Sequence, residues 1–310
     1  MRKVHEFTSC EIFMNKVLVL LSSYNGEKYI KEQINSILNQ KNVDINILIR
    51  DDGSSDNTQN ILKEIEAKCS RIHCIFENNI GYKHSFMKLV YQAGSEYDYY
   101  AFADQDDVWL EDKMSAAISM IDITSPCLYY SMMSQVDVNL NMLEEQQEYK
   151  YPLNKKMILF QNFVQGSTIV FNKKLYSLLH KYKMSKEVAH DIWIPIVASY
   201  FGKIVYDTNS YILYRKHEDA VTVKMKKNYW HKLFSRIFGN EKIDNYAIYL
   251  IEGYEEDLSK EDYIFLKKCR DYAKVGNKIK LLFDVNVKKY SIKGTMFLKF
   301  ALIFNRMERV

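Results

Sequence analysis

The sequence has few cysteines, and their positions exclude two common kinds of small-domain scaffold. There are five, an odd number, widely spaced and without a single C-x-x-C pair. A disulfide framework usually needs an even number of cysteines, and a structural zinc site needs closely spaced pairs. Both are therefore excluded, and a reducing cytoplasm is the environment that this cysteine usage predicts.

The chain also lacks membrane-spanning, secretory and strongly charged segments. No uncharged stretch reaches the ~18 residues that a transmembrane helix needs. Residues 1–15, which we predict to be an unpatterned leader, carry Glu6 and Glu11 before the first apolar run, unlike a signal peptide. The net charge of +4 is too small to indicate nucleic-acid binding, so no nucleic-acid partner is expected.

Two glycine-rich phosphate-binding motifs are absent as well. The sequence contains neither G-x-G-x-x-G nor G-x-x-x-x-G-K-[ST], which cradle phosphates on backbone N–H groups. A nucleotide bound by this chain would need a metal ion to neutralise its diphosphate.

What the sequence does contain is an alternation of short apolar runs and segments of helical periodicity. The runs at 16–22, 45–49, 72–76 and 97–102 predict buried strands, and each of the first three is followed by a predicted helix. Such alternation predicts an α/β fold with an open, mostly parallel sheet. We expect this domain over 16–223 and a smaller addition over 224–310.

Beyond residue 110 the pattern is looser. We expect strands at 127–132, 161–171, 204–207 and 211–214, with helices over 113–123 and from about 175. A further apolar segment follows His190 and Asp191, and Asp191 could simply be the N-cap of a helix there.

Three carboxylates stand together directly after the fourth strand. Asp104, Asp106 and Asp107 lie in the stretch A-D-Q-D-D-V-W, and clustered carboxylates stay ionised in a water-poor site only when a cation or donors compensate them. A hard divalent ion fits, although an acidic surface turn is the simpler alternative. An EF-hand fits worse, because Trp109 occupies the position that needs glycine.

The loops after the parallel strands should face one crevice, since ligands bind beyond the carboxyl ends of such strands. The first loop offers Ser22, Tyr24 and Asn25, and the second offers Asp51 and Asp52. Together with the acidic stretch they form the candidate binding site.

The last part of the chain differs in composition. Residues 274–310 hold nine Lys or Arg against only Asp284 and Glu308, and 296–304 are mostly apolar. The segment can be a helix packed on the main domain with a basic outer side. Alternatively, it attaches the protein to an anionic membrane surface.

In order and spacing, four motifs resemble the family 2 glycosyltransferases. They are V-L-L-S-S-Y-N-G-E-K-Y at 19–29, R-D-D-G-S-S-D at 50–56, D-Q-D-D-V-W at 104–109 and H-D at 190–191. More narrowly, they resemble the bacterial rhamnosyltransferases that build cell-wall and capsular polysaccharides. The resemblance covers roughly residues 16–217.

This resemblance implies a GT-A fold, an inverting mechanism, a nucleotide-sugar donor and a Mg2+ or Mn2+ ion. Asp191 would be the catalytic base and Asp106 a metal ligand, with His217 at a place where some members add a second one. The remaining positions would contact the donor: Ser22, Tyr24, Asn25, Asp52 and Asp104.

The resemblance further implies a cytoplasmic enzyme at the inner face of the membrane, which transfers a sugar to a lipid-linked or growing glycan. L-Rhamnose from dTDP-L-rhamnose is the best guess, and a UDP-hexose is the alternative. The chain lacks the Q-x-x-R-W element of processive synthases after Asp191, so we expect transfer of one or a few sugars. A sugar nucleotidyltransferase and a non-catalytic glycan-binding scaffold remain rivals.

Overall fold

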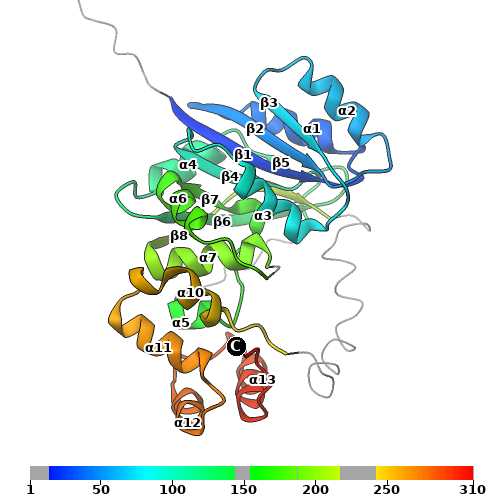
Figure 1. The fold of residues 1–310 in the computed structure, drawn as a ribbon. Helices are drawn as coiled ribbons and strands as arrows, with labels where there is room; N and C mark the ends of the chain where they lie inside the picture. Colours follow the sequence, from blue (N-terminus) through cyan, green and yellow to red (C-terminus); the bar gives the residue numbers. More distant parts are fainter. Residues whose placement is uncertain (1–13, 144–153, 187, 217–241, 310) are drawn as a thin grey trace, which may run out of the picture.

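The computed structural model of the protein describes residues 14–143, 154–186, 188–216 and 242–309. Its centre is an eight-stranded sheet with the order β3-β2-β1-β4-β7-β6-β8-β5 (Figure 1). The strands in chain order are β1 (Asn15–Ser23), β2 (Val43–Asp51), β3 (Ile72–Phe76), β4 (Tyr99–Ala103), β5 (Val108–Trp109), β6 (Cys127–Val136), β7 (Val170–Asn172) and β8 (Lys203–Arg215).

The first half of the sheet is parallel, and the second half is mixed. β1 lies between β2 and β4 and is parallel to both, while β3 extends the sheet on the outer side of β2. β7 is antiparallel to β4 and β6, and β6 is parallel to β8. The predicted α/β fold with a mostly parallel sheet is therefore confirmed.

Helices cover both faces of the sheet, as the apolar character of the strands requires. They are α1 (Ile30–Leu38), α2 (Thr58–Glu66), α3 (Tyr82–Gln92), α4 (Lys113–Met120), α5 (Lys155–Ile158), α6 (Lys173–Lys181) and α7 (His190–Phe201). Alternate residues of β1 enter different cores, with Leu18 and Leu20 on one side and Val17 and Val19 on the other. The carboxyl ends of these strands are consequently fixed on a rigid support.

Three expectations for the second half were wrong. Of the strand expected at 161–171, only Val170 and Phe171 lie in a strand, β7, and Gly166–Thr168 forms a 3-10 turn (η1). The two strands expected at 204–207 and 211–214 are one continuous strand, β8. Asp191 is not an N-cap, because α7 begins at His190 with Ala189 as its cap.

The C-terminal segment is helical, as predicted, and packs on the sheet domain. Its elements are α10 (Tyr246–Tyr254), η2 (Glu255–Asp257), α11 (Lys260–Arg270), α12 (Val275–Phe283) and α13 (Ile292–Ile303). Leu250 and Tyr254 of α10 belong to the same core as Trp193 and Val197 of α7. The boundary expected near residue 223 lies outside the described residues and stays a prediction.

None of the described helices combines the length and the apolar character that crossing a bilayer requires.

Candidate active site

The loop after β1 and the acidic loop after β4 are joined by a glutamine side chain. The backbone N–H of Tyr24 donates to Oε1 of Gln105 at 2.7 Å, and the Gln105 amide donates to the Tyr24 carbonyl at 3.0 Å. Gly26 makes room for this contact, since a Cβ there would lie 2.4 Å from Oε1 of Gln105. The clamp holds the two predicted donor-binding loops against each other.

The loop after β1 is also tied to the loop after β2. The N–H of Asn25 donates to Oγ of Ser54 at 2.9 Å, and the N–H of Ser55 donates to Oδ1 of Asn25 at 2.8 Å. Asn25 adopts a left-handed backbone (φ 52°), which asparagine tolerates better than most residues. The oxygen of its side chain thus positions the second loop, whereas the Tyr24 side chain remains 48% exposed.

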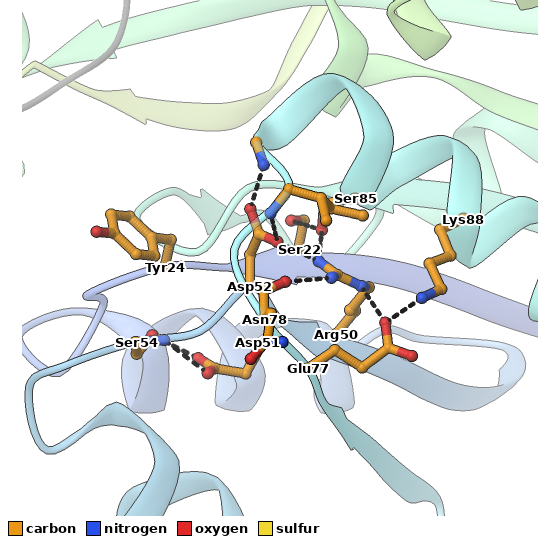
Figure 2. A network of polar contacts seen from close by, with 12 residues as sticks. Ser22, Tyr24, Arg50, Asp51, Asp52, Ser54, Glu77, Asn78, Ser85 and Lys88 are labelled. Carbon is orange, nitrogen blue, oxygen red and sulfur yellow. Dashed lines mark hydrogen bonds and ion pairs between the residues drawn. The ribbon is translucent and has the colours of Figure 1, made fainter. Parts of the chain in front are cut away.

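A buried arginine organises the end of β2 (Figure 2). The guanidinium of Arg50 donates to Oδ1 of Asp52 at 2.5 Å and to Oε2 of Glu77 at 2.9 Å. It also donates to the carbonyl of Asn78 and to Oγ of Ser85, both at 3.0 Å. A buried cation is tolerated when it is paired and hydrogen-bonded in this way.

The carboxylate of Asp52 accepts hydrogen bonds at both of its oxygens and can accept one more. The N–H of Ile80 donates to its Oδ1 and the N–H of Gly81 to its Oδ2, both at 2.8 Å. A carboxylate oxygen can accept two hydrogen bonds, so Oδ2 can still accept a bond from a ligand. Ser22 lies beside this group, with 2.5 Å between its hydroxyl and that of Ser85 (Figure 2).

Replacing Arg50 with methionine should strongly destabilise the protein. The change leaves the buried carboxylate of Asp52 without its cation, which typically costs about 3–5 kcal/mol of the free energy of unfolding. Arg71→Met is the matched control, because Arg71 is exposed and such substitutions usually change stability by less than about 0.5 kcal/mol. Denaturant unfolding of both variants measures the difference, and equal losses would contradict this role of Arg50.

The three carboxylates of the acidic loop have different surroundings. Burial, followed by the charges of Asp106 and Asp191, raises the pKa of Asp104 to about 7. Asp107 instead points inward, where it accepts the N–H of Arg215 at 3.3 Å, and burial raises its pKa well above the ordinary value. Asp104 and Asp106 are half-buried, whereas the fully buried Asp107 supports the loop.

The start of α7 lies beside the end of β4, because the rings of His190 and Phe102 pack with their centroids 4.3 Å apart. The charge of Asp191 accordingly contributes to the raised pKa of Asp104, although 87 positions separate the two residues. Asp191 is the second residue of α7, and the side-chain amide of Asn162 donates to its Oδ2 at 3.0 Å. Burial raises the pKa of Asp191, and the bond from Asn162 opposes this shift. The structure therefore brings the predicted base to the acidic loop.

His190 is buried and anchors the start of α7. Its ring packs on Phe86 and Phe102, with centroids 4.2 and 4.3 Å away, and burial lowers its pKa to about 3. Gly166 lets the η1 turn approach this ring, since a Cβ there would lie 2.4 Å from Nε2 of His190. The position of Asp191 depends on this packing.

The residues that the structure describes hold only part of a metal site. Within the described ranges, no three His, Cys, Asp or Glu side chains form a ready-made metal site. His217, the second predicted ligand, lies outside those ranges. Asp104 and Asp106 offer hard oxygen ligands, which suit Mg2+ or Mn2+, and diphosphate oxygens could complete the coordination. The residues present fit such an ion.

Several residues that shape the site were not predicted from the sequence. Arg50 and Gln105 stand inside the recognised motifs, and a charged residue at the end of the buried strand β2 was an available signal for Arg50. Asn162 and Gly166 offered no such signal, because their partners in α7 lie more than 20 positions away.

Comparison with known proteins identifies the family. A model described as Glycosyl transferase family 2 matches residues 18–179. A dTDP-rhamnosyl transferase of Shigella flexneri is 32% identical over 222 residues, which cover 64% of this chain and 72% of that protein. A GalNAc(5)-diNAcBac-PP-undecaprenol beta-1,3-glucosyltransferase of Campylobacter jejuni is 24% identical, covering 90% of both chains.

Among solved structures, TarS 1-349 of S. aureus in complex with UDP-GlcNAc is similar, with a TM-score of 0.56 and 18% identity. The match covers 91% of this chain and 78% of that one. A mannosyltransferase of Pyrobaculum calidifontis, in complex with GDP-Man and Mn2+, gives a TM-score of 0.50 at 12% identity, covering 94% and 81%. These similarities confirm the predicted GT-A fold. Because the family model matches more than half of the chain, the protein belongs to glycosyltransferase family 2.

Proposed function

We propose that this glycosyltransferase is a metal-dependent inverting enzyme that transfers a sugar from a nucleotide sugar to a hydroxyl of a lipid-linked or growing glycan. The observation that carries the proposal is the packing of His190 on Phe102, with ring centroids 4.3 Å apart, because it places the neighbouring Asp191 near the acidic loop that follows β4. A base on one side and hard oxygen ligands on the other are what a single displacement at the anomeric carbon requires.

The nucleoside would bind between the loops after β1 and β2. Oδ2 of Asp52 can accept a hydrogen bond from the base, and the fixed donors around this carboxylate keep it oriented without further rearrangement. The exposed ring of Tyr24 offers a stacking surface, and Ser22 offers a hydroxyl. Asn25 would act mainly by holding these loops together.

The diphosphate would lie over the acidic loop. Asp106, with Asp104 beside it, would hold the Mg2+ or Mn2+ ion, and that ion would neutralise charge on the departing nucleoside diphosphate. Asp104 would also contact the ribose or the donor sugar. His217 remains a proposed additional ligand.

Asp191 would take the proton from the attacking hydroxyl. A carboxylate is a stronger base when its pKa is raised, and burial raises that of Asp191. The side-chain amide of Asn162 would hold this carboxylate in place for the acceptor hydroxyl.

dTDP-L-rhamnose is the proposed donor, supported by the name of the Shigella flexneri relative. The Campylobacter jejuni relative is named as a glucosyltransferase, so a UDP-hexose is the alternative. Thermal-shift measurements with dTDP, UDP and GDP, each with and without Mn2+, test the assignment. We expect the largest Mn2+-dependent rise in Tm with dTDP. A larger rise with UDP would favour the alternative, and no rise with any nucleotide would contradict the donor site.

The proposed acceptor is a glycan on a lipid carrier, supported by the undecaprenol diphosphate in the name of the Campylobacter jejuni relative. An acceptor of this kind would place the enzyme at the inner face of the cell membrane, in contact with the cytoplasm that supplies nucleotide sugars.

Gly166→Ala should lower kcat by about 10²-fold, because a displacement of about 1 Å at a catalytic group has an effect of that size. The added Cβ would lie 2.4 Å from His190 and shift the start of α7, where Asp191 lies. Gly276→Ala is the matched control, since no atom lies within 4 Å of its Cβ. Steady-state kinetics of both variants test this, and an unchanged kcat for Gly166→Ala would contradict it.

A further inference from the structure

The C-terminal helices end in a surface that no described part of the chain covers. Figure 1 shows α12 and α13 side by side at the end of the molecule away from β1, β2 and β3. In this region Phe283, Val285 and Ile292 are 82%, 78% and 81% exposed. Ile279 and Met296 are exposed as well. We call these five side chains the apolar tip.

The mostly apolar stretch 296–304 does not form a single exposed face. In the structure Ala301 is buried with Leu298 and Leu302, whereas Met296 and Phe304 are exposed. Apolar residues of α13 lie on more than one side of the helix, so some of them pack on the protein whereas others have no described neighbour. Soluble monomers rarely expose several large apolar side chains in one place.

Positive charge borders the apolar tip. Lys280 of α12, Lys288 of the connection and Lys293 of α13 are exposed, and none forms an ion pair with a residue that the structure describes. By contrast, Lys299 turns inward and donates to the carbonyls of Leu281 and Asp284. Three cations therefore remain available to a partner at this surface.

We propose that the apolar tip and these three lysines form a docking surface for an anionic lipid bilayer. The apolar side chains would enter the boundary between headgroups and acyl chains, and the lysines would contact anionic headgroups. The surface gives a physical form to the membrane association proposed above. The proposed docking surface is inferred only from the exposure of these side chains and from their charge. It therefore does not depend on which donor or which catalytic base the enzyme uses.

A second copy of the chain is a poorer partner for this surface. In a twofold dimer the same patch meets itself, so both copies would bring Lys280, Lys288 and Lys293 into one interface. Like charges brought together in this way oppose association. An anionic membrane complements both the charge and the apolar character.

Co-sedimentation of the full-length protein with vesicles tests the proposal without any substrate. We expect binding to vesicles of phosphatidylcholine with phosphatidylglycerol, and much weaker binding to phosphatidylcholine alone. The double variant Phe283→Ser/Ile292→Ser should bind at least about tenfold more weakly, since it removes two large apolar side chains from the contact. The triple variant Lys280→Glu/Lys288→Glu/Lys293→Glu should lose the preference for anionic vesicles.

Ile123→Ser is the matched control, because Ile123 is 66% exposed but lies on the sheet domain. It should bind vesicles like the wild type, and all variants should keep the wild-type Tm because the changed residues are exposed. Absence of binding to anionic vesicles, or undiminished binding of the double variant, would overturn the proposal. The proposal would also be overturned if sedimentation equilibrium showed that the wild type is a dimer and that the double variant is a monomer which still binds vesicles. A negative result would leave the assignment of the transfer reaction untouched, because the assay contains neither donor nor acceptor.

Discussion

Replacing Asp191 with asparagine is expected to lower kcat by about 10²–10⁴-fold, the usual contribution of a general base. Asparagine keeps the size of the side chain and can still interact with Asn162, but it cannot accept the proton of the acceptor hydroxyl. Binding of nucleoside diphosphate should stay nearly unchanged, because Asp52 and the loops that would hold the nucleoside are built from other elements.

Kinetics and nucleotide binding must be measured on the same protein preparation. Asp112→Asn is a suitable control, since Asp112 is exposed and its side chain makes no capping bond to α4. It should behave like the wild type in both measurements. A variant Asp191→Asn that retains substantial turnover would show that another group takes the proton.

Asp106→Ala is expected to remove the effect of the metal on nucleotide binding. In the wild type, Mn2+ should strengthen the binding of nucleoside diphosphate by about 10²-fold, since a bound divalent ion stabilises phosphate charge by several kcal/mol. Without the Asp106 carboxylate, one of the hard oxygen ligands of the acidic loop is lost. Affinities with and without Mn2+ should then become similar.

Isothermal titration calorimetry of the wild type, Asp106→Ala and Asp112→Ala separates metal binding from general damage. Asp112→Ala should keep the full response to Mn2+, because Asp112 lies outside the crevice loop. If Asp106→Ala responds to Mn2+ as strongly as the wild type, Asp106 is not a metal ligand. If the wild type itself shows no response, the metal-dependent account fails as a whole.

The first half of the fold was predictable because apolar runs and helical periodicity, which mark its strands and helices, are local features of the sequence. The apolar run at 16–22 and the helical spacing of Ile30, Ile34 and Ile37 each reflect burial on a parallel sheet, and the structure confirms both. The second half depends on contacts that periodicity does not encode. Around Gly166, a turn replaces the expected strand, because the chain packs against His190 of a helix that begins 24 positions later.

The candidate site shows the same division. The motifs predicted roles for the aspartates of the acidic loop and for Asp191, which stay predictions, and topology explains why side chains at strand ends gather. The sequence could not show that Arg50 is buried under Asp52, or that Asn162 binds Asp191, since both contacts form only after folding. Asn25 was predicted to contact the donor. In the structure the oxygen of its side chain accepts a hydrogen bond from the loop after β2, a contact that the sequence alone does not reveal.

The most direct test of the account is a transfer assay with a panel of nucleotide sugars. Purified protein, Mn2+ and membrane extract containing lipid-linked glycans are incubated with each labelled donor, and label in the glycan is measured together with released nucleoside diphosphate. The account predicts label from one donor, with dTDP-L-rhamnose expected, and loss of that label with Asp191→Asn. No label and no nucleotide release from any donor would contradict it and favour a non-catalytic glycan-binding protein on the same fold.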